Sequence, residues 1–162
     1  MNKEKKQIVV VLDNIRSTHN VGSIFRTADA LGVGQMILCG TTPTPTDRFG
    51  RARKDIAKVA LGAEESISWK YEEDTIKVLK DLKKVGYLIV AIEQAENSMD
   101  YKKVKLDKNG KVAFIMGEEV EGVKPKILKL VDVIAEIPML GQKESLNVSV
   151  AFGVAVFRIL SI

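Results

Sequence analysis

The sequence is poor in the side chains that form disulfides and bind metals. Its 162 residues include one cysteine, Cys39, and one histidine, His19. A single thiol excludes an internal disulfide and a cysteine-rich metal site, and a single imidazole argues against a conventional zinc site. His19 alone is more typical of a hydrogen-bonded structural residue than of a catalyst. We therefore expect no bound metal.

Long apolar runs and signal sequences are also missing. No stretch approaches the roughly 20 apolar residues that a membrane helix needs, and the C-terminal apolar run is interrupted by Arg158. The basic N-terminus, MNKEKKQIVVVL, has an apolar run shorter than a signal-peptide core and lacks a small-residue cleavage site. The sequence predicts a soluble, cytoplasmic protein without membrane contact.

Two nucleotide-binding signatures are absent as well. The turn that follows the first apolar run, DNIRSTHNVGS, lacks the glycine triplet that brings a helix N-terminus close to a pyrophosphate. No P-loop pattern of the form GxxxxGKS or GxxxxGKT occurs. Both absences disfavour a small-molecule enzyme that holds a nucleotide through a Rossmann or P-loop fingerprint.

What is present is the composition of one globular domain. Hydrophobic residues make up 46% of the chain and charged residues 28%, which argues against intrinsic disorder. This length suits a single domain, and we expect one over residues 1–162. The net charge of +4 permits contact with a polyanion without requiring it.

Short β-branched apolar runs alternate with segments of helical periodicity. This alternation predicts an α/β fold with a parallel sheet, flanked by helices and joined by right-handed crossovers. The expected strands cover 7–12, 35–40, 66–69, 87–93, 111–117 and 133–138. The expected helices cover 20–31, 73–84 and 145–160, and another begins at Pro125.

The last expected helix is apolar on nearly every face beyond Ser149. A helix that is apolar all round must be covered all round, and one layer of a small sheet covers only one side. We therefore predict a homodimer in which a second copy of the chain covers the rest of this helix.

Polar side chains gather just after three of the expected strands. They lie in NIRSTHNVGSIFRTADALG (14–32), GEEVEG (117–122) and IPMLGQKESLN (137–147), which we call the first, second and third motifs. Open α/β sheets build their sites beyond the carboxyl ends of the strands, so the motifs are candidates for a functional site. In isolation, Glu119 of the second motif could be a solvated turn residue.

The other polar residues also have purely structural interpretations. Asn20 suits a helix N-cap, and Ser145 or Asn147 suits the same role at the last helix. Arg26 could extend into solvent or pair with Asp29.

The densest positive charge follows the second expected strand. Residues 47–58 hold five cations and two acids, a local excess of +3. Such a run is by default a solvated face, but it also offers the best candidates for salt-dependent phosphate contacts. These candidates are Arg48, Arg51, Arg53, Lys54 and Lys58.

Taken together, the three motifs resemble those of the SpoU (TrmH-like) family of RNA ribose 2'-O-methyltransferases, within the SPOUT superfamily. The resemblance runs through most of the chain, including AIEQ at 91–94, and the third motif, extended to IPMLGQKESLNVSVA, is the most specific part. The matching residues are Asn20 and Arg26 in the first motif, Gly117, Glu119 and Gly122 in the second, and Ser145 and Asn147 in the third.

The resemblance implies a fold and a cofactor. The C-terminal part of such a domain is threaded as a deep trefoil knot, and the knot forms a pocket for S-adenosylmethionine in a cleft shared with a dimer partner. It implies RNA as the substrate, with tRNA favoured over rRNA. The implied cofactor-binding residues are Ile92, Gly117, Gly122, Ile137, Met139 and Leu146.

The resemblance also implies catalytic roles. Arg26 is either the base or a cation that stabilises the forming alkoxide, and we favour the cation because a neutral guanidinium is costly to prepare. Asn20, Ser145 and Asn147 would position the substrate and the arginine, and Glu119 would fix the orientation of Arg26 or of the motif loop.

Two departures from the family pattern affect these expectations. Glu118 stands where many members have Asn, which adds a negative charge beside the site. We also expect no additional N-terminal RNA-binding domain of the kind that larger relatives have, so that the single domain recognises RNA itself. An rRNA enzyme is one alternative. A catalytically inactive RNA-binding module of the same fold is another, which the complete set of five catalytic residues disfavours.

Overall fold

The computed structural model describes residues 7–107 and 110–162. Residues 1–6, the basic segment weighed above as part of a signal peptide, lie outside the described part. None of the helices in that part has the length and apolar composition that crossing a membrane requires.

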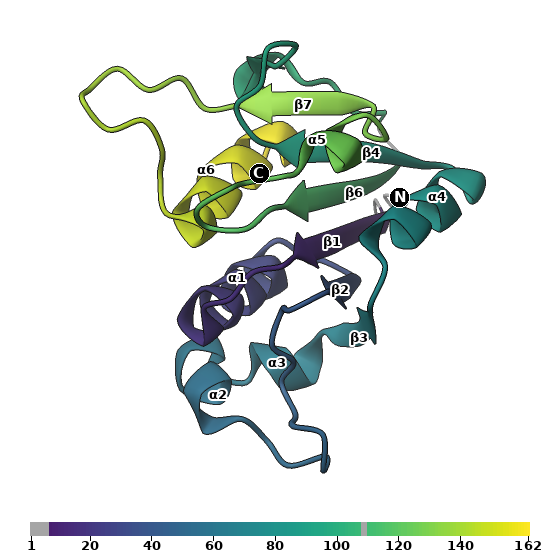
Figure 1. Cartoon of the computed structure of the whole chain (residues 1–162), viewed down its shortest axis with the longest axis vertical. Helices are drawn as coiled ribbons and strands as arrows, with labels where there is room; N and C mark the ends of the chain where they lie inside the picture. Colours follow the sequence, from purple (N-terminus) through teal and green to yellow (C-terminus); the bar gives the residue numbers. More distant parts are fainter. Residues whose placement is uncertain (1–6, 108–109) are drawn as a thin grey trace.

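Seven parallel strands form one sheet in the order β3-β2-β1-β6-β4-β7-β5 (Figure 1). Central β1 pairs with β2 and β6 in a register that aligns Val10 with Met36 and Phe114. The predicted α/β class is therefore confirmed. The strands are β1 Gln7–Asp13, β2 Gln35–Cys39, β3 Ser68–Glu72, β4 Tyr87–Ile92, β5 Met99–Asp100, β6 Lys111–Met116 and β7 Val133–Glu136.

The helices cover both faces of the sheet. Helices α1, α2, α3 and α6 pack on one face, and α4 and α5 pack on the other. They are α1 Thr18–Ala30, α2 Lys54–Ala60, α3 Ala63–Ser66, α4 Thr75–Lys84, α5 Pro125–Leu128 and α6 Val148–Leu160, with a short 3-10 helix at Tyr101–Lys103.

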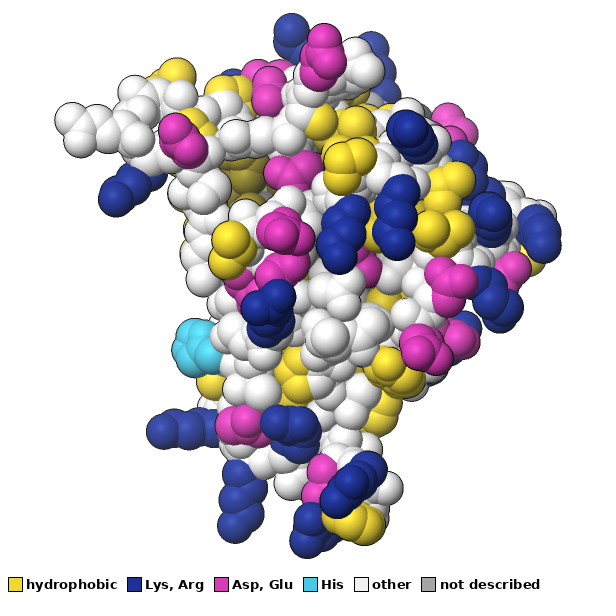
Figure 2. Space-filling view, viewed as in Figure 1, with side chains coloured by type: hydrophobic (Ala, Val, Ile, Leu, Met, Phe, Trp, Pro, Cys, Tyr) yellow, Lys and Arg dark blue, Asp and Glu magenta, His cyan; other side chains and the backbone are white. Residues whose placement is uncertain are grey.

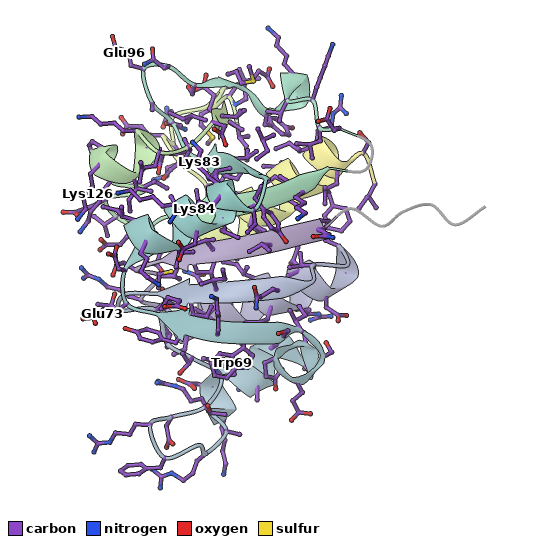
Figure 3. All side chains as sticks on the ribbon, turned by 90° about the vertical axis from the view of Figure 1, so that its right-hand side faces the viewer. Trp69, Glu73, Lys83, Lys84, Glu96 and Lys126 are labelled. Atoms are coloured by element: carbon purple, nitrogen blue, oxygen red, sulfur yellow. The ribbon has the colours of Figure 1, made fainter. Side chains whose placement is uncertain are left out.

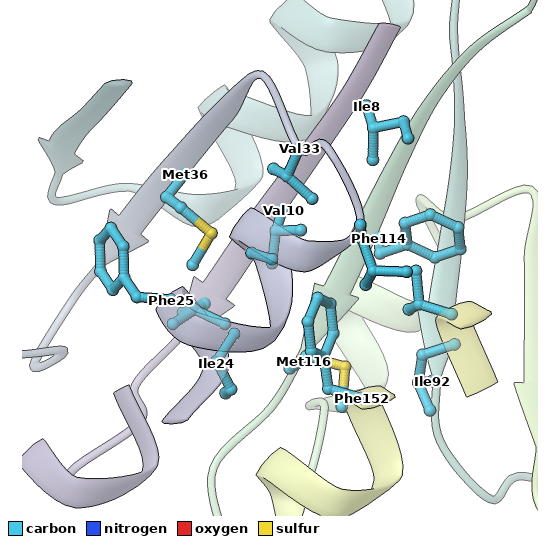
Figure 4. Packing of buried hydrophobic residues seen from close by; sticks show 14 of the residues in the cluster. Ile8, Val10, Ile24, Phe25, Val33, Met36, Ile92, Phe114, Met116 and Phe152 are labelled. Atoms are coloured by element: carbon cyan, nitrogen blue, oxygen red, sulfur yellow. The ribbon is translucent and has the colours of Figure 1, made fainter. Parts of the chain in front are cut away.

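Side chains alternate between two apolar cores along each central strand. In β1, Val10 points to the core under α1 and α6, whereas Val9 and Val11 point to the core under α4. Strands buried on both faces read as continuous apolar runs, which explains the pattern of the sequence. In the larger core, Phe25 lies near Met36 and Phe152 lies near Met116 (Figure 4).

Element ends differ from the sequence-based expectation where capping decides them. Helix α1 begins at Thr18 because the Ser17 side chain accepts a hydrogen bond from the backbone N–H of Asn20, so Asn20 is not the cap. Helix α6 begins three residues later than expected, because the Asn147 side chain caps it by accepting from the Ser149 N–H. Ser145 therefore lies in the preceding loop.

The structure of residues 54–72 also differs from the sequence-based expectation. The predicted strand at 66–69 begins two residues later, because residues 63–66 form the short helix α3. No short helix was expected at Lys54–Ala60 either. Helix α2 has seven residues and α3 has four. Both are too short to show the apolar periodicity by which a helix is recognised in a sequence.

Candidate active site

A cleft of about 190 Å³ opens beyond the carboxyl ends of β4, β6 and β7. Its walls come from the residues after these strands and from the first turn of α6, which includes Val148 and Ala151. Glu119 and Ser145 also line it. All six residues expected to bind the cofactor are among the lining residues: Ile92, Gly117, Gly122, Ile137, Met139 and Leu146.

The second motif folds back on itself, which explains its two glycines. A Cβ atom on Gly117 would lie 2.3 Å from the backbone of Gly122 and Val123, so no side chain fits there. Gly122 has a φ of 66°, a left-handed conformation that glycine adopts without strain. The close approach requires glycine at position 117 and brings the backbones of Gly117 and Gly122 together at the wall of the cleft.

Glu93 fastens the folded motif and was not singled out from the sequence. Its Oε2 accepts a hydrogen bond of 2.8 Å from the Val123 N–H, and its Oε1 accepts one from the Gln94 N–H. The Gln94 side chain in turn donates to the Glu144 carbonyl over 2.8 Å. The available signal was an acid placed directly after a buried strand.

The polar residues of the three motifs meet in one network. The side-chain Nδ2 of Asn20 donates to Oε1 of Glu119 over 3.1 Å, and Asn147 Nδ2 donates to Oδ1 of Asn20 over 3.1 Å. Glu119 also accepts from the backbone N–H groups of Arg16 and Ser17. Asn20 is buried at this junction, so its hydrogen bonds fix the relative positions of the motifs.

Hydrogen bonding controls the charge state of Glu119. Partial burial acts to raise the pKa of Glu119, but the hydrogen bonds from the Asn20 side chain and from backbone N–H groups outweigh it. The net effect lowers the pKa of this carboxyl below its ordinary value, because these donors favour the charged form. Glu119 is therefore an acceptor in the network at neutral pH.

Arg26 belongs to α1, as Asn20 does, but its side chain lies on a different surface of this helix. Its side chain is exposed and lines a shallow depression between α1 and α6, beside Ser149, Val150 and Val154. In the part of the chain that the structure describes, Arg26 has no ion pair, and Asp29 instead accepts a hydrogen bond from Ser66. Within one chain, the lining residues of this depression and of the cleft do not overlap.

Glu118 forms an ion pair at the edge of the site. Its Oε1 lies 2.8 Å from Nη2 of Arg16, and the Glu118 side chain is 7% exposed whereas that of Arg16 is 73% exposed. The negative charge that distinguishes the second motif is thus neutralised by a residue of the first motif. The arginine was not identified from the sequence as its partner.

The basic run occupies the end of the molecule away from the cleft. Figure 2 shows Lys and Arg side chains gathered at the lower end, where Figure 1 places α2 and the loop before it. Arg51 pairs with Asp47 over 2.8 Å, and Arg53 lies 3.6 Å from Asp55. All five predicted phosphate-binding residues belong to this surface, but none lines the cleft.

Comparisons with known proteins agree with this architecture. The model of the SpoU rRNA methylase family matches residues 7–157. A 23S rRNA (guanosine-2'-O-)-methyltransferase, RlmB, from Ralstonia nicotianae is 34% identical over 96% of the chain and 59% of its own length. The chain thus spans about three fifths of the length of such curated relatives.

Two solved structures show the same arrangement. The A. aeolicus TrmH/SpoU tRNA modifying enzyme superposes with a TM-score of 0.82 and 27% identity, over 98% of this chain and 76% of the other. An AdoMet-bound rRNA methyltransferase from Sinorhizobium meliloti has a TM-score of 0.82 and 29% identity, over 98% and 57%. This match implies the predicted knot in the C-terminal part. The chain belongs to the SpoU rRNA methylase family.

Proposed function

We propose that this chain transfers a methyl group from S-adenosylmethionine to a ribose 2'-hydroxyl of RNA, with tRNA as the first choice of substrate. The observation that carries the proposal is the junction of the three motifs, in which Asn20 joins Glu119 and Asn147 beside the cleft. The AdoMet-bound relative from Sinorhizobium meliloti supports the choice of cofactor.

The chemistry of the cleft suits this cofactor. Apolar side chains such as Ile92 and Leu146 offer a surface for an adenine ring, and the folded glycine motif offers peptide groups for hydrogen bonds. The cofactor supplies an electrophilic methyl group on a positively charged sulfur. Acidic side chains that line the cleft favour a cation: Glu93, Glu119 and Glu121.

The chain must activate a weak nucleophile, because a neutral ribose hydroxyl attacks slowly. A guanidinium is a permanent cation in proteins, so Arg26 stabilises negative charge as it develops on the 2'-oxygen. The hydroxyl proton leaves to a substrate phosphate or to water. Asn20 and Asn147 hold in place the motifs that position the substrate in line with the methyl group, and Ser145 at the rim of the cleft binds the ribose.

A homodimer completes the site in this proposal. The surface around Arg26 is partly apolar, with Val150 48% and Val154 42% exposed on α6. A second copy that covers this surface would place Arg26 of one protomer beside the cleft of its partner. The predicted apolar surplus of α6 and the separation of Arg26 from its own cleft both support this arrangement.

The decisive test of activity is methyl transfer from labelled S-adenosylmethionine to separated tRNA and rRNA fractions. We expect label in tRNA, at a ribose whose backbone resists alkaline cleavage, and label in rRNA alone would assign the alternative substrate. RNA binding without tight cofactor binding in calorimetry and without methyl transfer would instead identify an inactive RNA-binding module. Replacement of Arg26 by Lys should abolish most of the transfer, because it keeps the charge but loses the planar fork.

Mixed dimers test whether Arg26 acts across subunits. Arg26→Ala and Leu146→Arg, which blocks the cleft, are each expected to be inactive. Co-refolded in equal amounts, they should regain about one quarter of the wild-type rate, because half of the dimers contain one complete site. A mixture without activity would place Arg26 and the cleft of one chain in the same site.

A further inference from the structure

Another concave surface lies between the basic loop and the edge strand β3. It is an open groove of about 750 Å³, which we call the aromatic groove. Three of the nine aromatic residues of the chain line it together with three arginines. These residues are Phe49, Trp69 and Tyr71, and Arg48, Arg51 and Arg53.

Two of the three aromatic rings in this groove are unusually accessible, and the third, Trp69, is partly buried. Phe49 is 66% exposed and Tyr71 is 47% exposed, whereas Phe25, Phe114 and Phe152 are fully buried. The Phe49 ring has no polar group that could form a hydrogen bond with water. Because the ring is exposed on a loop, it also adds no buried apolar area to the core. The exposed rings therefore offer faces for a ligand.

Phe49 is flanked by positive charge. The guanidinium carbon of Arg48 lies 4.8 Å from the centre of the ring, and that of Arg51 lies 5.0 Å from it. Asp47 holds the loop by accepting hydrogen bonds from the N–H groups of Phe49 and Arg51 and by pairing with the Arg51 side chain. The ring and the two guanidinium groups are thus presented on an ordered loop rather than on a loose one.

The opposite wall of the groove is equally fixed. Trp69 and Tyr71 alternate with Lys70 on β3, so both rings project from the same side of the edge strand. The Tyr71 hydroxyl donates a hydrogen bond of 2.9 Å to the carbonyl of Gly40. Figure 3 shows Trp69 at the lower margin of this strand, toward the loop that carries the arginines.

We propose that the aromatic groove binds unpaired nucleobases of the substrate RNA by stacking, while its arginines contact the flanking phosphates. Aromatic and guanidinium planes are the surfaces on which unpaired bases stack, and arginine supplies the charge that the phosphates require. The local excess of positive charge favours RNA over an uncharged or basic partner. This inference rests on the proposed function, because it takes RNA as the substrate.

Trp69 provides a direct probe, since it is the only tryptophan of the chain. In the 162-residue chain, single-stranded oligoadenylate should quench the tryptophan fluorescence, and an RNA duplex of the same length should quench it much less. Polyglutamate serves as a polyanion without bases. Equal quenching by polyglutamate would overturn the inference in favour of an acidic protein partner or of charge alone.

Variants separate stacking from charge. Phe49→Leu keeps an apolar side chain but removes the ring, so it should weaken oligoadenylate binding about tenfold without changing its salt dependence. Tyr71→Leu should weaken binding similarly, whereas Tyr71→Phe, which keeps the ring, should bind like the wild type. Thermal melting of each variant checks that it is folded.

The methyl-transfer assay distinguishes failure of this inference from failure of the proposed function. We expect Phe49→Leu to raise the KM for RNA about tenfold and to leave the affinity for S-adenosylmethionine unchanged. If Phe49→Leu changes neither the KM for RNA nor the oligoadenylate affinity in an active enzyme, the proposed role of the aromatic groove is wrong. The proposed function would be unaffected by that result. Absence of transfer to any RNA, with base-specific quenching intact, would overturn the proposed function but not the binding of bases.

Discussion

Oε1 of Glu119 accepts a hydrogen bond of 3.1 Å from the side chain of Asn20, although the two residues are 99 positions apart in the sequence. This contact ties the loop after β6 to the start of α1. Asn147 extends the link to the start of α6 through the other end of the same amide. The three motifs are therefore mechanically connected before any ligand binds.

Acid should weaken this connection. The pKa of Glu119 is lowered in the folded chain, so its stabilising contribution is complete above the ordinary value of 4.5 and is lost as the pH falls through the folded value. We expect Glu119→Gln to reduce the free energy of unfolding at pH 7 and to differ less from the wild type at pH 3. Denaturant unfolding at both pH values measures this, with the exposed neighbour Glu121→Gln as the control. A constant difference at the two pH values would contradict it.

Adding one methyl group to Gly117 should damage the cleft. The new Cβ atom would lie 2.3 Å from the backbone of Gly122, which cannot yield without opening the folded motif. We expect Gly117→Ala to cost about 1–3 kcal/mol of stability and to abolish S-adenosylmethionine binding in calorimetry. Gly141→Ala is the matched control, because a Cβ atom there has no neighbour within 4 Å. Equal behaviour of the two variants would refute the role given to the close approach.

The pair of Arg16 and Glu118 should be energetically coupled. Removal of Arg16 leaves the carboxylate of Glu118, only 7% exposed, without its counter-charge. In a double-mutant cycle with Arg16→Met and Glu118→Gln, we expect a coupling of about 1 kcal/mol in the free energy of unfolding. Additive losses would show that the contact contributes nothing to stability.

RNA binding should depend on salt through the basic end of the molecule. Lys54→Gln combined with Lys58→Gln is expected to reduce the slope of log affinity against log salt by about 1.4 for single-stranded RNA, since each phosphate contact contributes about 0.7. The control pair, Lys77→Gln with Lys80→Gln, lies on α4 at the opposite face of the sheet. If both pairs change the slope equally, the basic run is only a solvated face.

Cys39 should be unreactive in the folded protein. Burial raises the pKa of Cys39 to about 12, an effect that a hydrogen bond with Thr75 only partly opposes. Because the thiolate is the reactive form, an aromatic disulfide reagent should modify the native chain slowly and the denatured chain rapidly. Rapid stoichiometric reaction of the native protein would contradict this expectation.

The core strands could be predicted because their pattern reflects burial on both faces. Val9, Val10 and Val11 all lie in apolar cores, and such an uninterrupted run indicates a central parallel strand in any sequence. Short elements were less predictable. The start of α6 depends on whether Ser145 or Asn147 provides the cap, and both residues suit that role by composition.

The sequence by itself indicated that the three motifs lie together at one site. Polar segments placed directly after strands of a parallel sheet emerge at its carboxyl edge, so the second and third motifs were expected there, and residues of both line the cleft. The assignment of Ile92, Gly117 and Ile137 to the cofactor came from the family resemblance, and all three line the cleft. Periodicity alone did not indicate the knot, which entered through family resemblance, because threading leaves no mark in local spacing.

Only the tertiary structure decided which side chains meet across distant loops. In the structure, Glu118 forms an ion pair with Arg16, and Glu93 accepts a hydrogen bond that holds the second motif in its folded conformation. Arg26 lines a depression that is separate from the cleft of its own chain. The tertiary structure also brings Phe49 of the basic loop to the same groove as Trp69 and Tyr71 of β3. The physical reason is that such contacts depend on how loops close and pack in three dimensions, whereas the sequence pattern reports only local periodicity and burial.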